Sequence, residues 1–261
     1  MNKDELLLLN QKGIFPAPLE DLTAFQKRVF ILLDHQLVDV EGTEESFKDL
    51  KEHYDIDPDW LSITKKKAFS FLKGAETLYE KDRPKIFLYR RPFSNSLYQE
   101  KELLTHEAVH ACRYAFPDSE FEEILAYRTS LKNYRRYIGP FFSLWWESLF
   151  WVILLCIYYT ISIYHLFYEQ PLLYVTSSLT ILFIFVFYTF RLMARQLIFK
   201  KARKHLSSFL KKTTNADPCL LRMTDKEIRL FQKEKNIKPY IEKQTELRWQ
   251  IIKWAYLKED I

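Results

Sequence analysis

The sequence SLFWVILLCIYYTISIYHLFY at residues 148–168 is followed, after Glu169 and Gln170, by PLLYVTSSLTILFIFVFYTF at residues 171–190. Apart from the titratable His165, neither stretch contains a charged side chain, over 21 and 20 residues respectively. A helix rises ~1.5 Å per residue, so each stretch is long enough to cross a hydrocarbon layer of ~30 Å. The short gap predicts a tight transmembrane hairpin. A pair of buried core helices is the alternative, and bilayer length in both stretches favours the membrane.

Basic residues flank the predicted hairpin at its outer ends and are absent from its turn. Three precede the first stretch and six follow the second, namely Lys132, Arg135 and Arg136, then Arg191, Arg195, Lys200, Lys201, Arg203 and Lys204. Cytoplasmic segments of membrane proteins carry an excess of lysine and arginine. We therefore expect an integral membrane protein with two spans, both termini in the cytoplasm and the hairpin tip on the opposite side.

Charge is unevenly distributed along the 261 residues. The net formal charge of +5 divides into +10 for residues 191–261, with 18 basic and 8 acidic side chains, and −5 for residues 1–190. Attraction to anionic lipid headgroups explains a basic segment that directly follows an apolar span. Nucleic-acid binding by this tail is a further alternative, and it requires binding that weakens steeply with salt. We expect contact with membrane lipid and no nucleic-acid partner.

The chain as a whole predicts an α+β, mainly helical architecture in three parts. Residues 1–140 are expected to form a mixed α and β domain, residues 141–195 the transmembrane hairpin, and residues 196–261 a basic helical cytosolic segment. Within the first part, the spacing of apolar residues predicts two helices and one strand. These lie at residues 19–38, 60–72 and 85–89 (KIFLY) respectively.

The C-terminal segment carries its own helix signals. Thr224 and Glu227 have the spacing of a capping box that opens a helix. Lys238-Pro239 then separates this helix from a second one, which is predicted to run to about Leu257. We therefore expect two helices after the hairpin.

The segment LLTHEAVHACRYAF at residues 103–116 contains the pattern HExxH. His106 and His110 are four residues apart, so on a helix they share one face about one turn apart. Two imidazoles spaced in this way can bind one zinc ion, and Glu107 between them can reach a water polarised by the metal. Zinc lowers the pKa of that water, and Glu107 can take its proton as it attacks a carbonyl. The alternative is an exposed helix whose histidines bind no metal.

The residues around the two histidines fit an amphipathic helix. Leu104, Ala108, Ala111 and Ala115 form an apolar stripe at ~100° per residue, and both histidines lie on the opposite side. This stripe can pack against a core while the histidines face a cleft. A capping box at residues 96–99, Ser96 with Gln99, is expected to start the helix just after the predicted strand.

A third protein ligand is needed, because two histidines alone do not complete a zinc site. The segment PDSEFEEILAY at residues 117–127 supplies Glu122 and Glu123. If Ser119 caps a helix here, Glu122 occupies its third position and folds back on the cap, which leaves Glu123 free to face the metal. Glu123 is therefore the preferred ligand and Glu122 the alternative. Without a metal, the two acids would be a solvated helix start favoured by the helix dipole.

Residues 103–127 resemble the gluzincin metallopeptidases, in which HExxH is followed by a glutamate on the next active-site helix. The run Glu123-Ile124-Leu125-Ala126 is similar to the ExxA element around the third ligand in several of those families. The resemblance implies a zincin-like domain that binds Zn²⁺ and cleaves a peptide or protein substrate. It assigns the role of zinc ligand to His106, His110 and Glu123. It assigns the role of general base to Glu107. Tyr127 and Arg113 are the nearby candidates for stabilising the oxyanion.

Taken together, the sequence predicts a membrane-anchored zinc metalloendopeptidase whose site faces the cytoplasm. The strand at residues 85–89 is expected to offer an edge on which an extended peptide lies. Because the site is outside both spans, cleavage within the membrane is disfavoured. A catalytically inert membrane-bound scaffold or adaptor is the alternative from another class, and the oligomeric state stays open.

Overall fold

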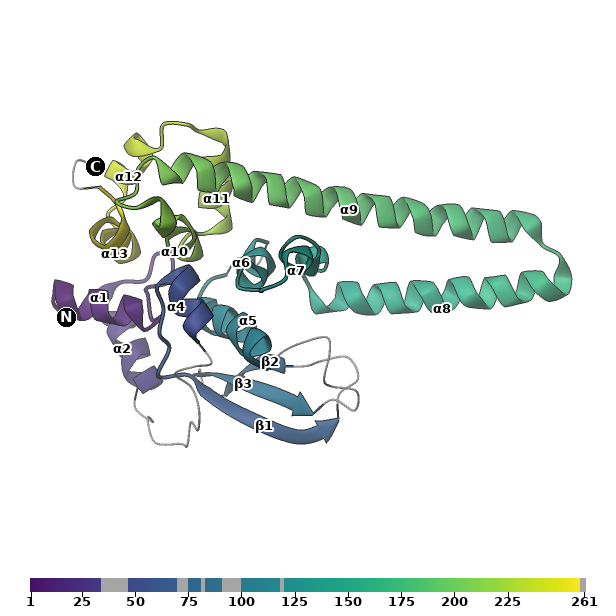
Figure 1. Cartoon of the computed structure of the whole chain (residues 1–261), viewed down its shortest axis with the longest axis horizontal. Coiled ribbons are helices and arrows are strands. Elements are labelled where there is room, and N and C mark those ends of the chain that lie inside the picture. Colours follow the sequence, from purple (N-terminus) through teal and green to yellow (C-terminus); the bar gives the residue numbers. More distant parts are fainter. Residues whose placement is uncertain (34–46, 70–74, 81–82, 91–99, 118–119, 259–261) are drawn as a thin grey trace.

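The computed structural model describes residues 1–33, 47–69, 75–80, 83–90, 100–117 and 120–258. Figure 1 shows a globular body from which two long helices project as a hairpin. The body is mainly helical and contains one small sheet, as expected. Its strands are β1 (Ser62–Phe69), β2 (Ala75–Glu80) and β3 (Arg83–Arg90). The helices before the hairpin are α1 (Lys3–Gln11), α2 (Leu22–Leu33), α4 (Lys48–Tyr54), α5 (Glu100–Arg113), α6 (Glu122–Arg128), α7 (Asn133–Ile138) and η1 (Gly139–Phe141). The hairpin and the helices after it are α8 (Trp145–Tyr168), α9 (Pro171–Ser207), η2 (Thr213–Asn215), α10 (Ala216–Leu221), α11 (Asp225–Lys233), α12 (Lys238–Lys243) and α13 (Leu247–Tyr256).

The sheet has the strand order β1-β3-β2. β1 runs parallel to β3, with Ser62 opposite Lys85, and β2 runs antiparallel to it. The strand predicted at residues 85–89 is confirmed by β3. The helix predicted at residues 60–72 is wrong, because residues 62–69 form β1. Residues 70–72 lie outside the described residues. The apolar residues of β1 fit either period, and pairing with a strand some twenty residues further along the chain decides the outcome.

β3 is the central strand of this sheet, with a neighbour on each side. The expectation that residues 85–89 offer a free edge to a peptide is therefore wrong. Among the described residues, β1 and β2 are the two edge strands, and β2 packs against α5. A strand added to the sheet beside α5 would therefore pair with β2.

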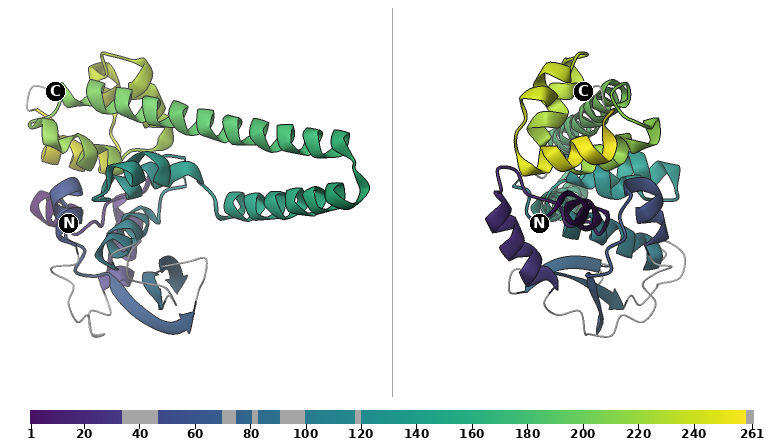
Figure 2. Two further views of the ribbon diagram at one scale, coloured as in Figure 1. Left: turned by 45° about the vertical axis from the view of Figure 1, so that its right-hand side comes forward. Right: turned by 90° about the vertical axis from the view of Figure 1, so that its left-hand side faces the viewer.

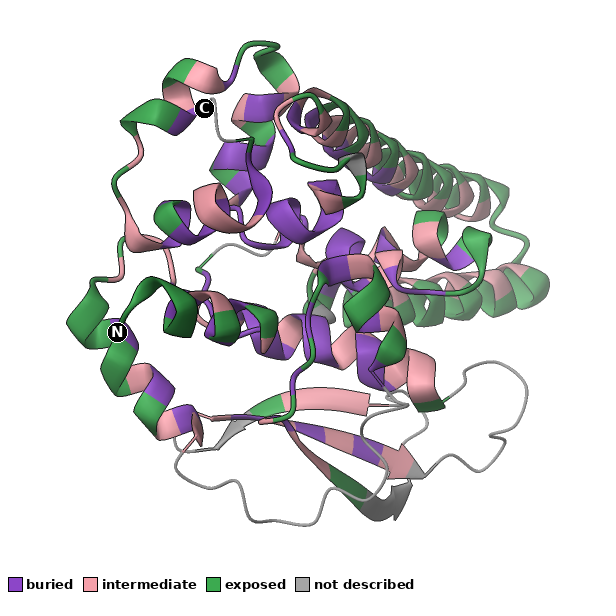
Figure 3. Cartoon of the chain, turned by 60° about the vertical axis from the view of Figure 1, so that its left-hand side comes forward, coloured by how far each residue is buried: buried purple, intermediate pink, exposed green. Residues whose placement is uncertain are grey.

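One hydrophobic core joins the parts of the chain before and after the hairpin (Figure 3). It contains Val109 of α5, Phe199 of α9 and Trp249 of α13, each at most 2% exposed. A second cluster packs α1 and α2 against Ile251 of α13. The C-terminal segment is therefore part of the same body as the helices that carry the predicted site.

The arginines of residues 191–261 make bonds within the fold. Each of these six arginines donates a hydrogen bond to another part of the chain. The pairs are Arg191 with Glu147, Arg195 with the carbonyl of Pro140, Arg203 with Asp217, Arg222 with Asn10, Arg229 with Glu120, and Arg248 with Glu227. Lysines of α9, by contrast, remain exposed at positions 200, 201 and 204. Part of the basic surplus of the tail therefore stabilises the body, whereas these three lysines are exposed.

The helices α8 and α9 are long and apolar enough to cross a membrane. In the most apolar 18-residue segment of α8 no residue is buried in the protein, and in that of α9 only 6% are buried. The two helices are therefore not core helices. Figure 2 shows them leaving the body together in a second view. The second helix continues well past residue 190, to Ser207, because residues 172–207 contain no proline or glycine to end it. Its last turns pack into the body through Phe199 and Leu206.

The base of the hairpin is held to the body by charged groups. Arg191 of α9 forms a two-pronged ion pair with Glu147 of α8, with distances of 2.6 and 2.8 Å between nitrogen and oxygen atoms. The amide of Ser143 also donates to Glu147. One turn further along α9, Arg195 donates to the carbonyl of Pro140 and to the Ser143 hydroxyl. These bonds fix the direction in which the hairpin leaves the body.

After the hairpin, the capping box predicted at Thr224 and Glu227 is confirmed at the start of α11. The single helix predicted after Pro239 is in fact two. Pro239 lies in the first turn of α12, which ends at Lys243, and α13 begins only at Leu247. Proline at this position favours the start of a helix because its missing amide would have no partner there.

Candidate metal centre

Helix α5 presents the two histidines of the HExxH pattern toward one point. Leu104, Ala108 and Ala111 are buried on its other face, as the apolar stripe predicts. His106 and His110 have ring centroids 4.9 Å apart, and their Nε2 atoms are 3.2 Å apart. The capping box predicted at residues 96–99 lies outside the described residues. The helix therefore aims two nitrogen ligands of the kind that zinc binds at a common position.

Helix α6 adds a carboxylate to the same point. The Oε2 atom of Glu123 is 3.6 Å from Nε2 of His106, and its Oε1 atom is 3.5 Å from Nε2 of His110. Two ligand atoms that bind one tetrahedral zinc ion at ~2.1 Å are ~3.4 Å apart. The spacing of the three groups therefore matches a single metal ion, and one ligand atom from each lies within 4.8 Å of the others. Among the described residues this is the one group of His, Cys, Asp or Glu side chains with such spacing.

Glu122 lies on the other side of the His110 ring. Its Oε1 atom is 2.7 Å from Nδ1 of His110, so a proton on Nδ1 is donated to Glu122 and the Nε2 lone pair is left for a metal. Such a carboxylate behind a histidine ligand fixes the tautomer and the orientation of the ring. The predicted cap Ser119 lies outside the described residues. The two adjacent glutamates thus have separate positions, Glu123 facing both histidines and Glu122 supporting one of them.

Glu107 lines the pocket that contains these groups. The hydroxyl of Thr77 on β2 donates to Oε2 of Glu107 at 2.8 Å, which holds the carboxylate in place. Sequence reasoning missed Thr77, because it lies in a strand that the sequence did not predict. A strand placed against the HExxH helix is the signal that would have pointed to it.

The charges of the cluster are strongly coupled. Burial and the neighbouring His110 lower the pKa of His106 well below its usual value. Burial also opposes protonation of His110, but the hydrogen bond to Glu122 and the charges of Glu123, Glu122 and Glu107 outweigh it and raise its pKa to about 10. Burial raises the pKa of Glu123 to about 6. The surplus of acids therefore attracts positive charge, which a divalent cation would supply in place of a proton.

The two candidates for stabilising an oxyanion, Tyr127 and Arg113, differ in their position relative to the pocket. The ring of Tyr127 packs 4.5 Å from that of His106 and lines the pocket. Arg113 is 1% exposed and donates to the backbone carbonyls of Leu221 and Met223. Those bonds direct its guanidinium toward the C-terminal segment, so the expectation that Arg113 contributes to the site is wrong. Tyr127 stays a candidate.

Comparison with protein-family models, curated proteins and solved structures finds no match to this chain. What can be said of the site therefore rests on its own residues and their geometry. The resemblance to gluzincins remains confined to the short segment that carries HExxH and the glutamate after it.

The pocket itself has a volume of about 490 Å³ and two kinds of wall. One wall is formed by α5, α6 and the start of β2. The opposite wall is formed by the junction between the body and the hairpin, through Gly139, Phe142, Ser143, Leu144 and Ser148. Gly139 is required here because a Cβ atom at this position would come within 2.3 Å of the Tyr127 ring. The candidate metal ligands therefore lie in a pocket large enough to hold part of a polypeptide chain.

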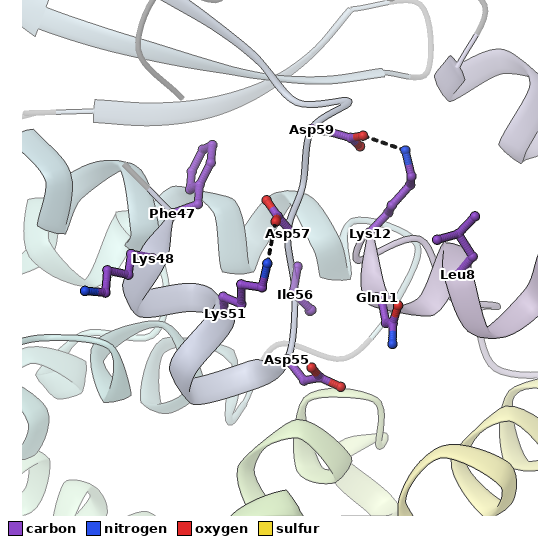
Figure 4. Close-up of a pocket in the computed structure, with 10 residues that line it drawn as sticks. All are labelled: Leu8, Gln11, Lys12, Phe47, Lys48, Lys51, Asp55, Ile56, Asp57 and Asp59. Atoms are coloured by element: carbon purple, nitrogen blue, oxygen red, sulfur yellow. Dashed lines mark hydrogen bonds and ion pairs between the residues drawn. The ribbon is translucent and has the colours of Figure 1, made fainter. Parts of the chain in front are cut away.

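A second pocket, of about 780 Å³, lies between α1, α4 and residues 55–59 (Figure 4). Four of its charged side chains form ion pairs, Lys51 with Asp57 and Lys12 with Asp59. None of the predicted site residues lines it. The chemistry predicted from the sequence is thus confined to the pocket at the base of the hairpin.

Proposed function

We propose that the protein is a membrane-anchored zinc metallopeptidase. His106, His110 and Glu123 hold the zinc ion, and Glu107 is the general base. The observation that carries this proposal is the convergence of His106, His110 and Glu123 in the pocket that Glu107 also lines. The two Nε2 atoms are 3.2 Å apart, and each is 3.5 to 3.6 Å from one of the two oxygens of Glu123. Two histidines and one carboxylate are a ligand set of catalytic zinc sites, which keep one position open for water or substrate.

In the proposed reaction, zinc would supply a Lewis acid that polarises water and the substrate carbonyl. Glu107 takes the proton of the attacking water and delivers it to the leaving amine. Thr77 keeps the Glu107 carboxylate aligned through its hydrogen bond. The hydroxyl of Tyr127 is the candidate donor to the developing oxyanion.

We propose that the substrate binds as an extended strand along the edge of β2 that faces away from β3. Residues 75–77 of this strand line the pocket. A peptide added to a sheet edge gains hydrogen bonds through its backbone, while alternate side chains enter pockets. This mode presents a backbone carbonyl of the peptide to the metal site with little dependence on sequence.

The exposed apolar helices α8 and α9 support membrane anchoring, and we propose that they cross the bilayer. The flanking cations favour an orientation with the body, both termini and the site in the cytoplasm. Lys200, Lys201 and Lys204 are exposed on α9 just beyond the apolar stretch, where they can contact anionic headgroups.

The proposal is tested with the full chain purified in detergent, by metal analysis and by hydrolysis of a mixed-sequence peptide library. We expect about one zinc ion per chain, loss of zinc in His106→Ala, and retained zinc with turnover lowered by about 10²–10⁴-fold in Glu107→Gln. His53→Ala and Glu52→Gln on α4 are matched controls outside the pocket and should behave as the unaltered chain.

Two outcomes would contradict the proposed peptidase function. A chain that binds no zinc and whose stability is unchanged by a chelator is instead a membrane-bound scaffold. Hydrolysis that survives Glu107→Gln at full rate would come from a contaminant or from a different group.

A further inference from the structure

The candidate site shares a wall with the start of the hairpin. Leu144 directly precedes α8 and Ser148 lies in its first turn, and both line the pocket. From Leu149 onward the helix exposes large apolar side chains, with Leu149, Val152 and Ile153 each about half exposed. The pocket therefore ends where the exposed apolar surface of α8 begins.

The ion pair between Glu147 and Arg191 marks this boundary on both helices. Glu147 is the acid that precedes the apolar stretch of α8, and Arg191 is the first cation after the apolar stretch of α9. Their side chains meet with nitrogen-to-oxygen distances of 2.6 and 2.8 Å. A charged pair is costly in hydrocarbon, so both residues mark the level at which the hydrocarbon layer begins.

The pocket is within one helical turn of that level. Ser148 follows Glu147 by one residue and Leu144 precedes it by three, which correspond to rises of ~1.5 and ~4.5 Å along a helix. Each headgroup layer of a bilayer is ~5–8 Å thick. The wall of the pocket therefore lies at headgroup depth, and a polypeptide must enter this layer to reach the metal ligands.

The charge of the pocket selects among such polypeptides. Its described lining includes the carboxylates of Glu76, Glu107, Glu122 and Glu123 and no lysine or arginine. Arg195, which acts on Glu123 electrostatically, is behind the wall and donates to the carbonyl of Pro140. Glu107, Glu122 and Glu123 alone carry three negative charges, of which a zinc ion compensates two. The remaining field favours a substrate segment that carries lysine or arginine.

We propose that the substrate is a polypeptide anchored in the same membrane, cut in an extended, basic segment that directly adjoins its membrane span. This rests on the proposed peptidase function and adds the class of substrate. Segments of this composition are found where spans leave the bilayer on the cytoplasmic side. Anchoring in the same bilayer also holds such a segment at the depth of the pocket, so less orientational freedom is lost on binding.

The test uses the full chain in phosphatidylcholine vesicles that contain phosphatidylglycerol. The probe is a randomised window rich in lysine and arginine, presented in three ways. In the first probe the window directly follows an apolar helix of ~20 residues. In the second, a flexible Gly/Ser linker of ~20 residues separates the window from the same helix. In the third, the window is free in solution. Cleavage is followed by mass spectrometry, with and without chelator and in Glu107→Gln.

We expect the window next to the helix to be cut about tenfold faster than the window behind the linker, although both are anchored. The free window should be slowest. Equal rates for the two anchored windows, or fastest cleavage of the free one, would overturn the membrane-proximal substrate and leave the peptidase intact. Absence of any cleavage that depends on zinc and Glu107 would overturn the peptidase itself.

The charge preference is tested separately with Glu76→Lys. The unaltered chain should cut windows containing lysine and arginine about fivefold faster than windows containing serine and glutamine, and Glu76→Lys should remove this preference. Glu52→Lys makes the same charge change on α4, outside the pocket, and should retain it. Equal cleavage of basic and neutral windows by the unaltered chain would contradict the inference.

Discussion

Glu122 and Glu123 are adjacent on α6, but their carboxylates make different contacts with the two histidines. Neighbouring residues of a helix point ~100° apart, so two adjacent carboxylates cannot face the same point. Glu123 faces the Nε2 atoms of both histidines, and Glu122 accepts a hydrogen bond from Nδ1 of His110 at 2.7 Å. The sequence favoured Glu123 through a cap at Ser119, whereas in the structure the hydrogen bond to His110 keeps Glu122 away from the metal position.

This division predicts different losses of metal affinity. Glu123→Gln removes a ligand and should abolish stoichiometric zinc binding. Glu122→Gln removes the support of His110 and should weaken zinc binding by about 10–100-fold. Competition with a fluorescent zinc chelator measures both, with the exposed Glu234→Gln as control. If Glu122→Gln lost zinc completely while Glu123→Gln lost little, the assignment of the two residues would be reversed.

At the scale of elements, the start of α11 and the start of α13 are joined by one buried carboxylate. Glu227 is 4% exposed and accepts hydrogen bonds from Arg248 at 2.8 and 3.0 Å, from the indole of Trp249 and from the amide of Thr224. Burial opposes its ionisation, but the charge and hydrogen bonds of Arg248 outweigh burial and lower the pKa of Glu227. The capping box that the sequence predicted thus also serves as an anchor between helices.

The lowered pKa of Glu227 predicts a loss of stability in acid. Its folded-state pKa is below the ordinary value of 4.5, so the ion pair stabilises the fold above that pH and its contribution is lost as the pH falls through the folded-state pKa. Glu227→Gln should lower the free energy of unfolding by about 3–5 kcal/mol at neutral pH and flatten this acid dependence. Thermal unfolding in detergent, followed by tryptophan fluorescence, measures both effects.

The surface variant Glu242→Gln on α12 is the matched control, since that carboxylate is about half exposed. It should change stability by less than about 0.5 kcal/mol. Melting curves of Glu227→Gln and the unaltered chain that shift in parallel with pH would show that Glu227 does not carry the acid dependence.

At the scale of the whole molecule, the C-terminal segment contacts the start of α6, the helix that carries the candidate ligand Glu123. The carboxylate of Asp225 accepts hydrogen bonds from the amides of Glu120 and Phe121, at 2.6 and 3.4 Å, just before α6 begins. These donors belong to the helix start, which would otherwise lack partners. Arg229 forms an ion pair with Glu120 at the same place. A residue about a hundred positions away therefore determines where Glu123 points.

Asp225→Ala should weaken zinc binding without touching a ligand. Loss of a helix cap costs about 1 kcal/mol, which corresponds to a roughly fivefold increase in the zinc dissociation constant if that energy is lost from the bound state. Lys226→Ala changes the exposed neighbouring residue and should leave the constant unchanged. Unaltered zinc affinity in Asp225→Ala, in a protein that stays folded, would show that α6 is positioned by other contacts.

Local patterns accounted for the parts of the fold that local interactions stabilise. The two apolar helices, the helix around HExxH, the strand KIFLY and the capping box at Thr224 and Glu227 depend on residues a few positions apart. Their hydrogen bonds are formed within the segment or at its ends, so spacing and composition carry the information. The spacing of His106 and His110 belongs to the same class.

The sequence by itself determined that a hairpin of membrane length exists and that two histidines share one helical face, because both follow from the period of a helix. Only the tertiary structure decided that residues 62–69 form a strand, that β2 and Thr77 lie beside Glu107, and that Asp225 caps the helix of Glu123. It also decided that the candidate metal ligands lie at the base of the hairpin. These features join segments far apart in the chain, whose pairing depends on how the core packs and not on any local period.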